Sequence, residues 1–198
     1  MRRFLVIGQR AGASPDFSLS DIPSTSGRLD VLIRCLRAAL LISHGVRRDT
    51  IVYLCLLGLA DRPRSLRFDG PAARYMRPDE RSLATVIKKC LAAPSSGGEF
   101  SEVRPGIAIA DGGVERVLAD LGEVALYVLE EGAPDLRTQS IAAADSCFVL
   151  GDHLGIPAAI RDVLQDRGAQ PVSVGPLSLH AEDVITLVAN ELDRRDIK

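Results

Sequence analysis

The sequence predicts an α/β fold with a mostly parallel sheet and helices on both of its faces. Short apolar runs that suit buried strands alternate with segments whose apolar residues recur at helical spacing. Two of the runs stop at glycines, one at Gly151 and the other at Gly175, and a helical pattern follows each. The 198 residues suit a single domain over residues 1–198.

The first part of the chain contains two predicted strands around one helix. Residues 4–8 and 50–57 are almost entirely apolar, which suits buried parallel strands. Residues 9–26 are rich in Ser, Pro, Asp and Gly and are expected to form a loop. Apolar positions recur at helical spacing in residues 28–43, and His44-Gly45 is expected to end that helix.

The remaining elements follow the same two patterns. Apolar runs predict strands at residues 65–69, 106–110, 124–129, 147–150 and 171–174. Helical periodicity predicts helices at residues 77–92, 113–121, 158–167 and 180–194. Pro78 suits a first helical turn. Residues 94–98 are expected to be a loop, and residues 141–144 a short bridging turn or helix.

Composition restricts the class of protein. The net charge of −2 is no overall basic signature, so nucleic-acid binding would have to come from a local patch. The four cysteines are widely spaced in apolar segments, which indicates buried thiols rather than a zinc or redox pair. The N-terminal apolar run, about five residues, is too short for a signal peptide, and no run approaches the ~20 residues of a membrane helix. We therefore expect a cytoplasmic protein without a membrane segment.

The two glycine-ended strands predict a ligand site. Open α/β sheets bind ligands in the crevice beyond the carboxyl ends of their strands, and glycine lets the backbone approach a ligand closely. Neither loop matches the GxGxxG dinucleotide fingerprint or the GxxxxGK[ST] phosphate loop. Backbone amides and carbonyls are therefore expected to hold any cofactor.

Three arginine and aspartate clusters are candidates for chemistry: residues 27–30 (GRLD), 44–49 (HGVRRD) and 77–81 (RPDER). Their arginines would bind phosphates and bases, and one aspartate would accept a proton. The alternative is that the clusters are helix starts and solvated surface. His153 and His180 follow the glycine loops, but a zinc site needs more ligands at closer spacing, so no metal is assigned.

Four motifs together indicate a family. They are GRLDVLIRCLRAALLISHGVRRDTIVYLCLLG (27–58), RPDERSLATVIKKCL (77–91), FVLGDHLGI (148–156) and VSVGPLSLHA (172–181). In this order and spacing the chain, from residue 4 to residue 193, resembles the archaeal tRNA pseudouridine N1-methyltransferases and their bacterial relatives. These enzymes belong to the SPOUT class, which uses S-adenosylmethionine.

The resemblance implies a C-terminal trefoil knot and a homodimer, neither of which periodicity predicts. The last helix, from about His180, would form much of the dimer interface, which would also cover its wide apolar face. The cofactor would lie in the knotted loops. Position by position, the resemblance assigns cofactor binding to Leu129, Gly151, Val174, Gly175, Pro176, Leu177, Ser178, Leu179 and Val184.

The implied reaction is methyl transfer to N1 of a pseudouridine, at position 54 of tRNA. Asp30 is the candidate base or orienting group, and Arg28 and Arg81 are the other candidate catalytic residues. Residues expected to contact RNA are Arg47, Arg48 and Arg77.

Three other functions remain open from the sequence. The first is a methyltransferase that modifies a pseudouridine of ribosomal RNA. The second is a non-catalytic SPOUT-like protein that binds RNA or assists assembly. The intact GDHLGI and GPLSLHA loops favour an active enzyme over the second of these. A protein that binds another nucleotide is disfavoured because no phosphate-loop motif is present.

Overall fold

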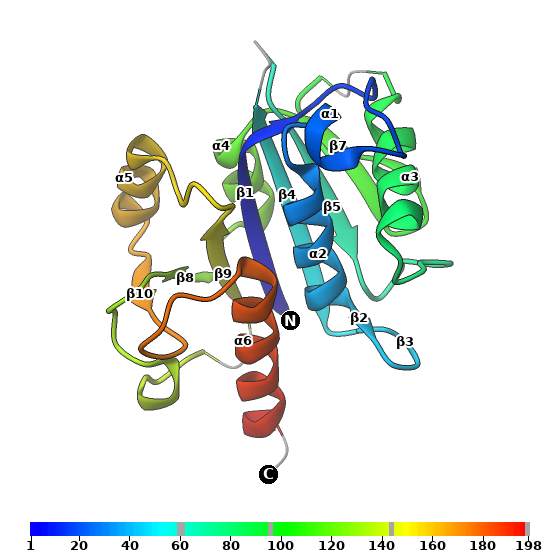
Figure 1. Cartoon of the computed structure of the whole chain (residues 1–198). Coiled ribbons are helices and arrows are strands. Elements are labelled where there is room, and N and C mark those ends of the chain that lie inside the picture. Colours follow the sequence, from blue (N-terminus) through cyan, green and yellow to red (C-terminus); the bar gives the residue numbers. More distant parts are fainter. Residues whose placement is uncertain (59–61, 95–96, 143–144, 197–198) are drawn as a thin grey trace.

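The computed structural model describes residues 1–58, 62–94, 97–142 and 145–196, except for the side chain of Asp196. Its centre is an eight-stranded sheet with the order β10-β8-β9-β1-β4-β5-β7-β6 (Figure 1). The pairs from β10 to β4 are parallel, and the pairs from β4 to β6 are antiparallel. The expectation of an α/β fold with a mostly parallel sheet is confirmed.

The strands of the large sheet span Arg2–Gly12 (β1), Thr50–Gly58 (β4), Arg64–Asp69 (β5), Ser101–Arg104 (β6), Ile107–Asp111 (β7), Ala125–Leu129 (β8), Ser146–Gly151 (β9) and Gln170–Val172 (β10). A separate hairpin pairs Leu41–Ile42 (β2) with Gly45–Val46 (β3). The helices span Ile22–Thr25 (α1), Leu29–Leu40 (α2), Glu80–Leu91 (α3), Val114–Leu121 (α4), Ala158–Asp166 (α5) and Ala181–Asp196 (α6), with a 3₁₀ turn at Leu136–Thr138 (η1).

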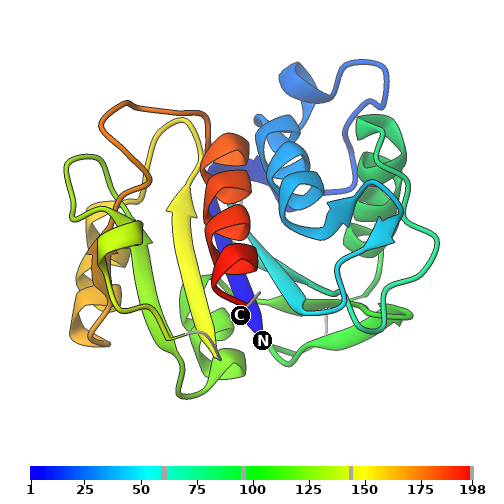
Figure 2. The ribbon, with the colours of Figure 1, turned by 90° about the horizontal axis from the view of Figure 1, so that it is seen from below.

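Helices cover both faces of the sheet, as expected. Side chains of β1 alternate between two cores: Phe4 packs with α2, α3 and α6, whereas Leu5 packs with α4 and α5. In Figure 2, α2, α3 and α6 lie on one side of the sheet and α4 on the other. The amphipathic periodicity of these helices follows from this arrangement, because each buries one face against the sheet.

The segment expected to be a loop at residues 9–26 is more regular than predicted. Strand β1 continues to Gly12, which pairs with Gly58 after an irregularity in the ladder. Helix α1 adds a turn, whose N-terminus is capped by Asp21 accepting the Ser24 N–H. The polar composition of residues 9–26 predicts neither feature. Strand β1 extends beyond its apolar run because it pairs with β4.

The helix expected at residues 28–43 ends earlier, at Leu40. Leu41 is already extended, and the next residues form the β2–β3 hairpin, so Gly45 lies in a hairpin and does not cap the helix. The helix expected at residues 77–92 begins at Glu80. Asp79 is its N-cap and accepts the Ser82 N–H at 2.8 Å, which places Pro78 before the helix.

Two strands near the sheet edges also differ from the expectation. Strand β6 was not predicted, because it is a four-residue edge strand whose mostly exposed, polar side chains give no apolar pattern. Strand β10 ends at Val172, so Val174 lies in the following loop. The bridging turn expected at residues 141–144 lies partly outside the described residues, and residues 141–142 form no regular element.

The apolar face of α6 is buried within its own chain. Ile185, Val188, Ala189 and Leu192 are at most 4% exposed and belong to the core shared with α2. This buried face therefore gives no support for a dimer, which stays a prediction. Within the described residues, no helix is long and apolar enough to cross a membrane.

Candidate functional site

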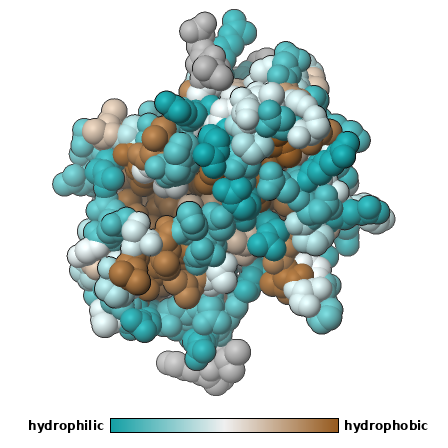
Figure 3. Space-filling view, viewed as in Figure 1, coloured by the Kyte–Doolittle hydropathy of each residue, from teal (hydrophilic) through white to brown (hydrophobic). Residues whose placement is uncertain are grey.

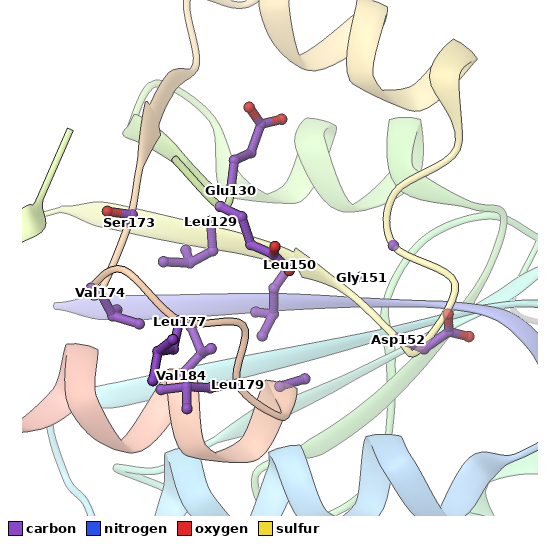
Figure 4. Close-up of a pocket in the computed structure, with 14 residues that line it drawn as sticks. Leu129, Glu130, Leu150, Gly151, Asp152, Ser173, Val174, Leu177, Leu179 and Val184 are labelled. Carbon is purple, nitrogen blue, oxygen red and sulfur yellow. The ribbon is translucent and has the colours of Figure 1, made fainter. Parts of the chain in front are cut away.

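A pocket of about 180 Å³ lies at the carboxyl ends of β8, β9 and β10 (Figure 4). It is closed by the loop of residues 173–180 and by the first turns of α6. The pocket is lined by Leu150 from β9, Leu177 from the loop and Val184 from α6. The pocket therefore lies where the glycine-ended strands predicted a ligand site.

Most of the residues predicted to bind a cofactor line this pocket: Leu129, Gly151, Val174, Gly175, Leu177, Leu179 and Val184. Pro176 and Ser178 do not line it, although they lie in the same loop. Lining residues that the sequence analysis missed are Glu130, Glu131, Leu150, Asp152, Gly155, Ser173 and Ala181. The sequence holds a signal for Glu130 and Glu131, because both directly follow the apolar run of β8.

Gly151 is required by a close backbone contact. A Cβ atom built at residue 151 would lie 2.1 Å from the carbonyl carbon and oxygen of Gly155. Gly155 itself has a φ of 75°, in the left-handed region that favours glycine. The GDHLG segment therefore folds back as a tight turn and leaves the floor of the pocket as bare backbone.

Three carboxylates approach the pocket from the ends of two strands, Glu130 and Glu131 after β8 and Asp152 after β9. Glu130 forms an ion pair with Arg161 of α5, and Glu131 accepts a hydrogen bond from the Ser178 hydroxyl. The Asp152 side chain is 1% exposed and accepts the backbone N–H groups of Gln9 and Leu154 at 2.8 and 2.9 Å. Asp152 thereby fixes the GDHLG segment to β1.

A chain of ion pairs connects the first turn of α6 to Arg28. Arg28 donates two hydrogen bonds to Asp30, at 2.9 and 3.1 Å. Arg34 donates to Asp30 at 2.9 Å and to Glu182 of α6 at 2.8 Å. Glu182 lies between Ala181 and Val184, which line the pocket, so the network and the pocket share one helical turn. Arg34 and Glu182 were not predicted as site residues.

The backbone before α2 adopts an unusual conformation. Gly27 and Arg28 both have left-handed φ values, 66° and 68°. A Cβ atom at residue 27 would lie 1.9 Å from the carbonyl oxygen of Arg10, so only glycine fits there. The strained Arg28 backbone is held by the bonds of its side chain to Asp30, and Arg28 is close enough to Asp152 for their charges to interact.

The carboxylate of Asp30 is ionised although it is buried. Burial raises its pKa, but the hydrogen bonds and charges of Arg28 and Arg34 outweigh that effect, and the pKa is lower than usual. A carboxylate with a lowered pKa is a weak proton acceptor. Of the two roles predicted for Asp30, the geometry therefore favours orientation of Arg28 over proton abstraction.

Arg47 and Arg48, predicted to contact RNA, bind other parts of the chain. Arg47 forms a two-pronged ion pair with Asp193 of α6, at 2.9 and 2.7 Å. The Arg48 guanidinium donates to the carbonyl oxygens of Gly70, Pro71 and Ala73. These bonds hold the segment before β4 against its neighbours, and the RNA contacts expected of both arginines stay a prediction.

Arg77 and Arg81 lie away from the Arg28–Asp30 network. Arg64, at the start of β5, bonds to the carbonyl oxygen of Leu91, which places the C-terminus of α3 at the end of the sheet where β4 finishes. The N-terminus of α3, with Arg81, therefore lies at the opposite end from Arg28. Both Arg77 and Arg81 are exposed.

The cysteines and histidines form no reactive site among the described residues. Cys35, Cys55, Cys90 and Cys147 are buried and unpaired, as expected. Burial raises the pKa of Cys90 to about 11 and that of Cys55 to about 12, which keeps the thiols protonated. No group of three potential metal ligands occurs in the described parts of the chain.

Comparison with known proteins gives consistent results. Residues 1–197 match a family model described as "Putative SAM-dependent RNA methyltransferase". The chain is 42% identical over 197 residues to the tRNA (pseudouridine(54)-N(1))-methyltransferase of Methanosarcina mazei, covering 99% of this chain and 92% of that protein. It is 40% identical over 195 residues to the enzyme of the same name from Halobacterium salinarum, covering 98% and 96%.

A similar solved structure is Archaeoglobus fulgidus Nep1 bound to S-adenosylhomocysteine. The TM-score is 0.66 with 99% of each chain covered, and the sequences are 14% identical. At that identity the similarity concerns the fold alone.

Proposed function

Because the chain belongs to the family of SAM-dependent RNA methyltransferases, we propose that it methylates N1 of a pseudouridine, at position 54 of tRNA. The observation that carries the proposal is the joining of the strand-end pocket to the Arg28–Asp30 network through one turn of α6. The names of relatives about 40% identical over the whole chain support this base and this RNA. They favour tRNA over ribosomal RNA and an enzyme over a non-catalytic binding protein.

The pocket suits S-adenosylmethionine. Its apolar walls, among them Leu129, Leu150 and Val184, would contact the adenine. The carboxylates of Glu130 and Glu131 complement ribose hydroxyls and a positively charged ligand. The bare backbone around Gly151 and Gly175 leaves N–H and C=O groups for hydrogen bonds. When bound, this cofactor supplies an electrophilic methyl group on a positively charged sulfur.

In the proposed mechanism the chain positions the base and stabilises its charge. N1 of pseudouridine carries a hydrogen, because the ribose is attached through carbon. N1 would take up the methyl group that the bound cofactor supplies, and the N1 proton would be lost to water. Arg28, oriented by Asp30, would stabilise the negative charge that develops on the uracil carbonyls.

We also propose the trefoil knot and the homodimer. The segment after β10 runs against the segment after β8, since Ser173 N–H donates to Pro134 and Leu136 N–H donates to Ser173. This contact is what a chain passing beneath the 130–142 segment on its way to α6 would make. For the dimer, the support is the apolar surface beside α6, where Leu177, Leu179 and Leu187 are 73%, 43% and 42% exposed (Figure 3). The cytoplasm, where tRNA is modified, is the proposed location.

Calorimetric titration of S-adenosylhomocysteine tests the pocket. Gly151 is a poor choice for a blocking substitution, because a side chain there collides with the Gly155 backbone. Ala181→Trp places an indole in the pocket, and we expect it to reduce affinity at least tenfold. Thr186→Trp, on the same helix but outside the pocket, is the matched control and should bind as the unmodified protein does.

Methyl transfer to purified RNA fractions then tests the substrate. Transfer to tRNA but not to ribosomal RNA is expected. A folded protein that binds no S-adenosylhomocysteine and methylates neither RNA would contradict the proposed function.

A further inference from the structure

A second surface, distant from the pocket, combines positive charge with an exposed aromatic side chain. A depression of about 230 Å³ on α3 is lined by Tyr75, Arg77, Thr85, Val86, Lys89 and Arg104, together with Ser82. Arg74 is exposed beside Tyr75. We refer to Arg74, Tyr75, Arg77, Lys89 and Arg104 as the α3 surface.

The cations of the α3 surface have no close ion-pair partner among the described residues, although the charge of Arg77 helps to lower the pKa of the exposed Asp79 carboxyl. None of Arg74, Arg77, Lys89 and Arg104 forms an ion pair or side-chain hydrogen bond with the described residues. The nearby carboxylates of Asp79 and Glu102 accept backbone N–H groups, from Ser82 and Gly106. Elsewhere in the chain, arginines such as Arg47 and Arg64 bind acceptors of the protein. The cations of the α3 surface are therefore available to an anionic partner.

The side chain of Tyr75 contributes little to the stability of the fold. Its side chain is 91% exposed, so it contributes almost nothing to the core. Its backbone φ of 55° is unfavourable for a bulky residue. An exposed ring beside unpaired cations is the arrangement that stacks on a nucleic-acid base while the cations contact phosphates.

The position of the surface suits an RNA that also enters the pocket. Helices α6, α2 and α3 cover the same face of the sheet, in that order (Figure 1). Two helix spacings of 8–10 Å, plus the offset along α3, put the α3 surface roughly 20–30 Å from the pocket. A folded RNA can span such a distance, whereas a single nucleotide cannot.

We propose that the α3 surface binds the RNA substrate outside its methylated loop, with Tyr75 stacked on a base and Arg77, Lys89 and Arg104 at phosphates. This inference rests on the proposed function and adds a second RNA-binding region to it. It also assigns to Arg77 a role that does not depend on the catalytic network.

The test is RNA binding by the full chain, measured by fluorescence anisotropy with a full-length tRNA transcript. Tyr75→Ala is expected to weaken binding about 5- to 100-fold, and Tyr75→Phe should restore it, because the ring is what stacks. The double substitution Arg77→Ala with Lys89→Ala should reduce the slope of log affinity against log salt by about 1.5. Arg167→Ala, which removes an exposed cation directly after α5 on the other face, should leave affinity and slope unchanged.

A second readout excludes general damage. A short oligonucleotide around the target pseudouridine cannot reach the α3 surface, so the variants should methylate it as the unmodified protein does. Affinity for S-adenosylhomocysteine should also be unchanged. Variants that bind full-length tRNA with normal affinity and salt dependence would overturn the proposal and point to an acidic protein as the partner. RNA binding without any methyl transfer by the unmodified protein would instead overturn the proposed function.

Discussion

Asp30 is a buried charge whose side chain is 4% exposed. It is stabilised by two guanidinium groups, and it belongs to the first turn of α2, where the helix dipole also favours a negative charge. Removing one partner of such a pair leaves the others poorly compensated. Asp30 therefore supports both the fold around α2 and the position of Arg28.

Asp30→Asn should lower the free energy of unfolding by about 2 kcal/mol at pH 7. The folded pKa of Asp30 is below its usual value, so its contribution is present above pH ~4 and is lost as the pH falls further. Urea unfolding at several pH values should therefore show a smaller decrease with acidification in the variant. Methyl transfer should fall at least tenfold, while S-adenosylhomocysteine affinity stays normal.

Asp16→Asn is the control for this prediction, because Asp16 is an exposed carboxylate of the 9–26 segment bonded to Ser14. Full turnover by Asp30→Asn, with unchanged affinity for RNA, would remove Asp30 from the mechanism.

Single residues of the site differ in how well the sequence predicts them. Gly151 and Gly175 could be predicted, because each ends an apolar run, although only Gly151 lies at the end of a strand and Gly175 lies in the loop after β10. Glu182 could not, since its partner Arg34 is 148 residues away in the chain. The ion pair of Arg47 could not be predicted either. Its sequence neighbours suggest an RNA contact, whereas in the fold Arg47 binds Asp193. Ion pairs that close over long separations leave no local signal.

Helix α6 connects three parts of the molecule. Its first turn lines the pocket, Glu182 binds Arg34, and Asp193 near its C-terminus binds Arg47 and Arg2. Its apolar face packs against α2 between these polar contacts. The position of the pocket wall therefore depends on both ends of the helix.

Arg47→Ala should lower the free energy of unfolding by about 1–2 kcal/mol, because a half-buried, two-pronged ion pair is lost. RNA affinity should not change. Arg77→Ala should behave in the opposite way. Its free energy of unfolding should stay within about 0.5 kcal/mol of that of the unmodified protein, and its RNA binding should be weaker. Urea denaturation and anisotropy measured on both variants check this pair. Weaker RNA binding by folded Arg47→Ala would restore Arg47 as an RNA contact.

At the level of elements, the sequence predicts apolar strands and amphipathic helices well. The sequence patterns do not predict segments whose structure depends on pairing with another strand. The β2–β3 hairpin interrupts a helical pattern, and β6 has no apolar alternation because it lies at the exposed edge of the sheet. Tertiary contacts determine these segments.

In the proposed function, the two halves of the sheet have different roles. The parallel half, from β10 to β4, provides the pocket, and the antiparallel half supports α3 and its cationic surface. The knot and the dimer are proposed from the family resemblance alone among sequence features, since no periodic pattern in the sequence predicts either of them.

Sedimentation should give a mass twice the 21.2 kDa of the chain. Leu187→Asp should shift the protein to monomers, because Leu187 is 42% exposed and lies in a groove between α6 and η1. Val103→Asp, a matched change on the exposed edge strand β6, should remain dimeric. A monomeric unmodified protein that transfers methyl groups normally would contradict the dimer.

The most direct measurement is nucleoside mass spectrometry of tRNA after incubation with the protein and S-adenosylmethionine. Two transcripts are compared that differ only in carrying pseudouridine or uridine at position 54. We expect 1-methylpseudouridine in the first transcript and no methylation in the second. Methylation of the uridine transcript, or of any other atom or nucleotide, would contradict the proposed function.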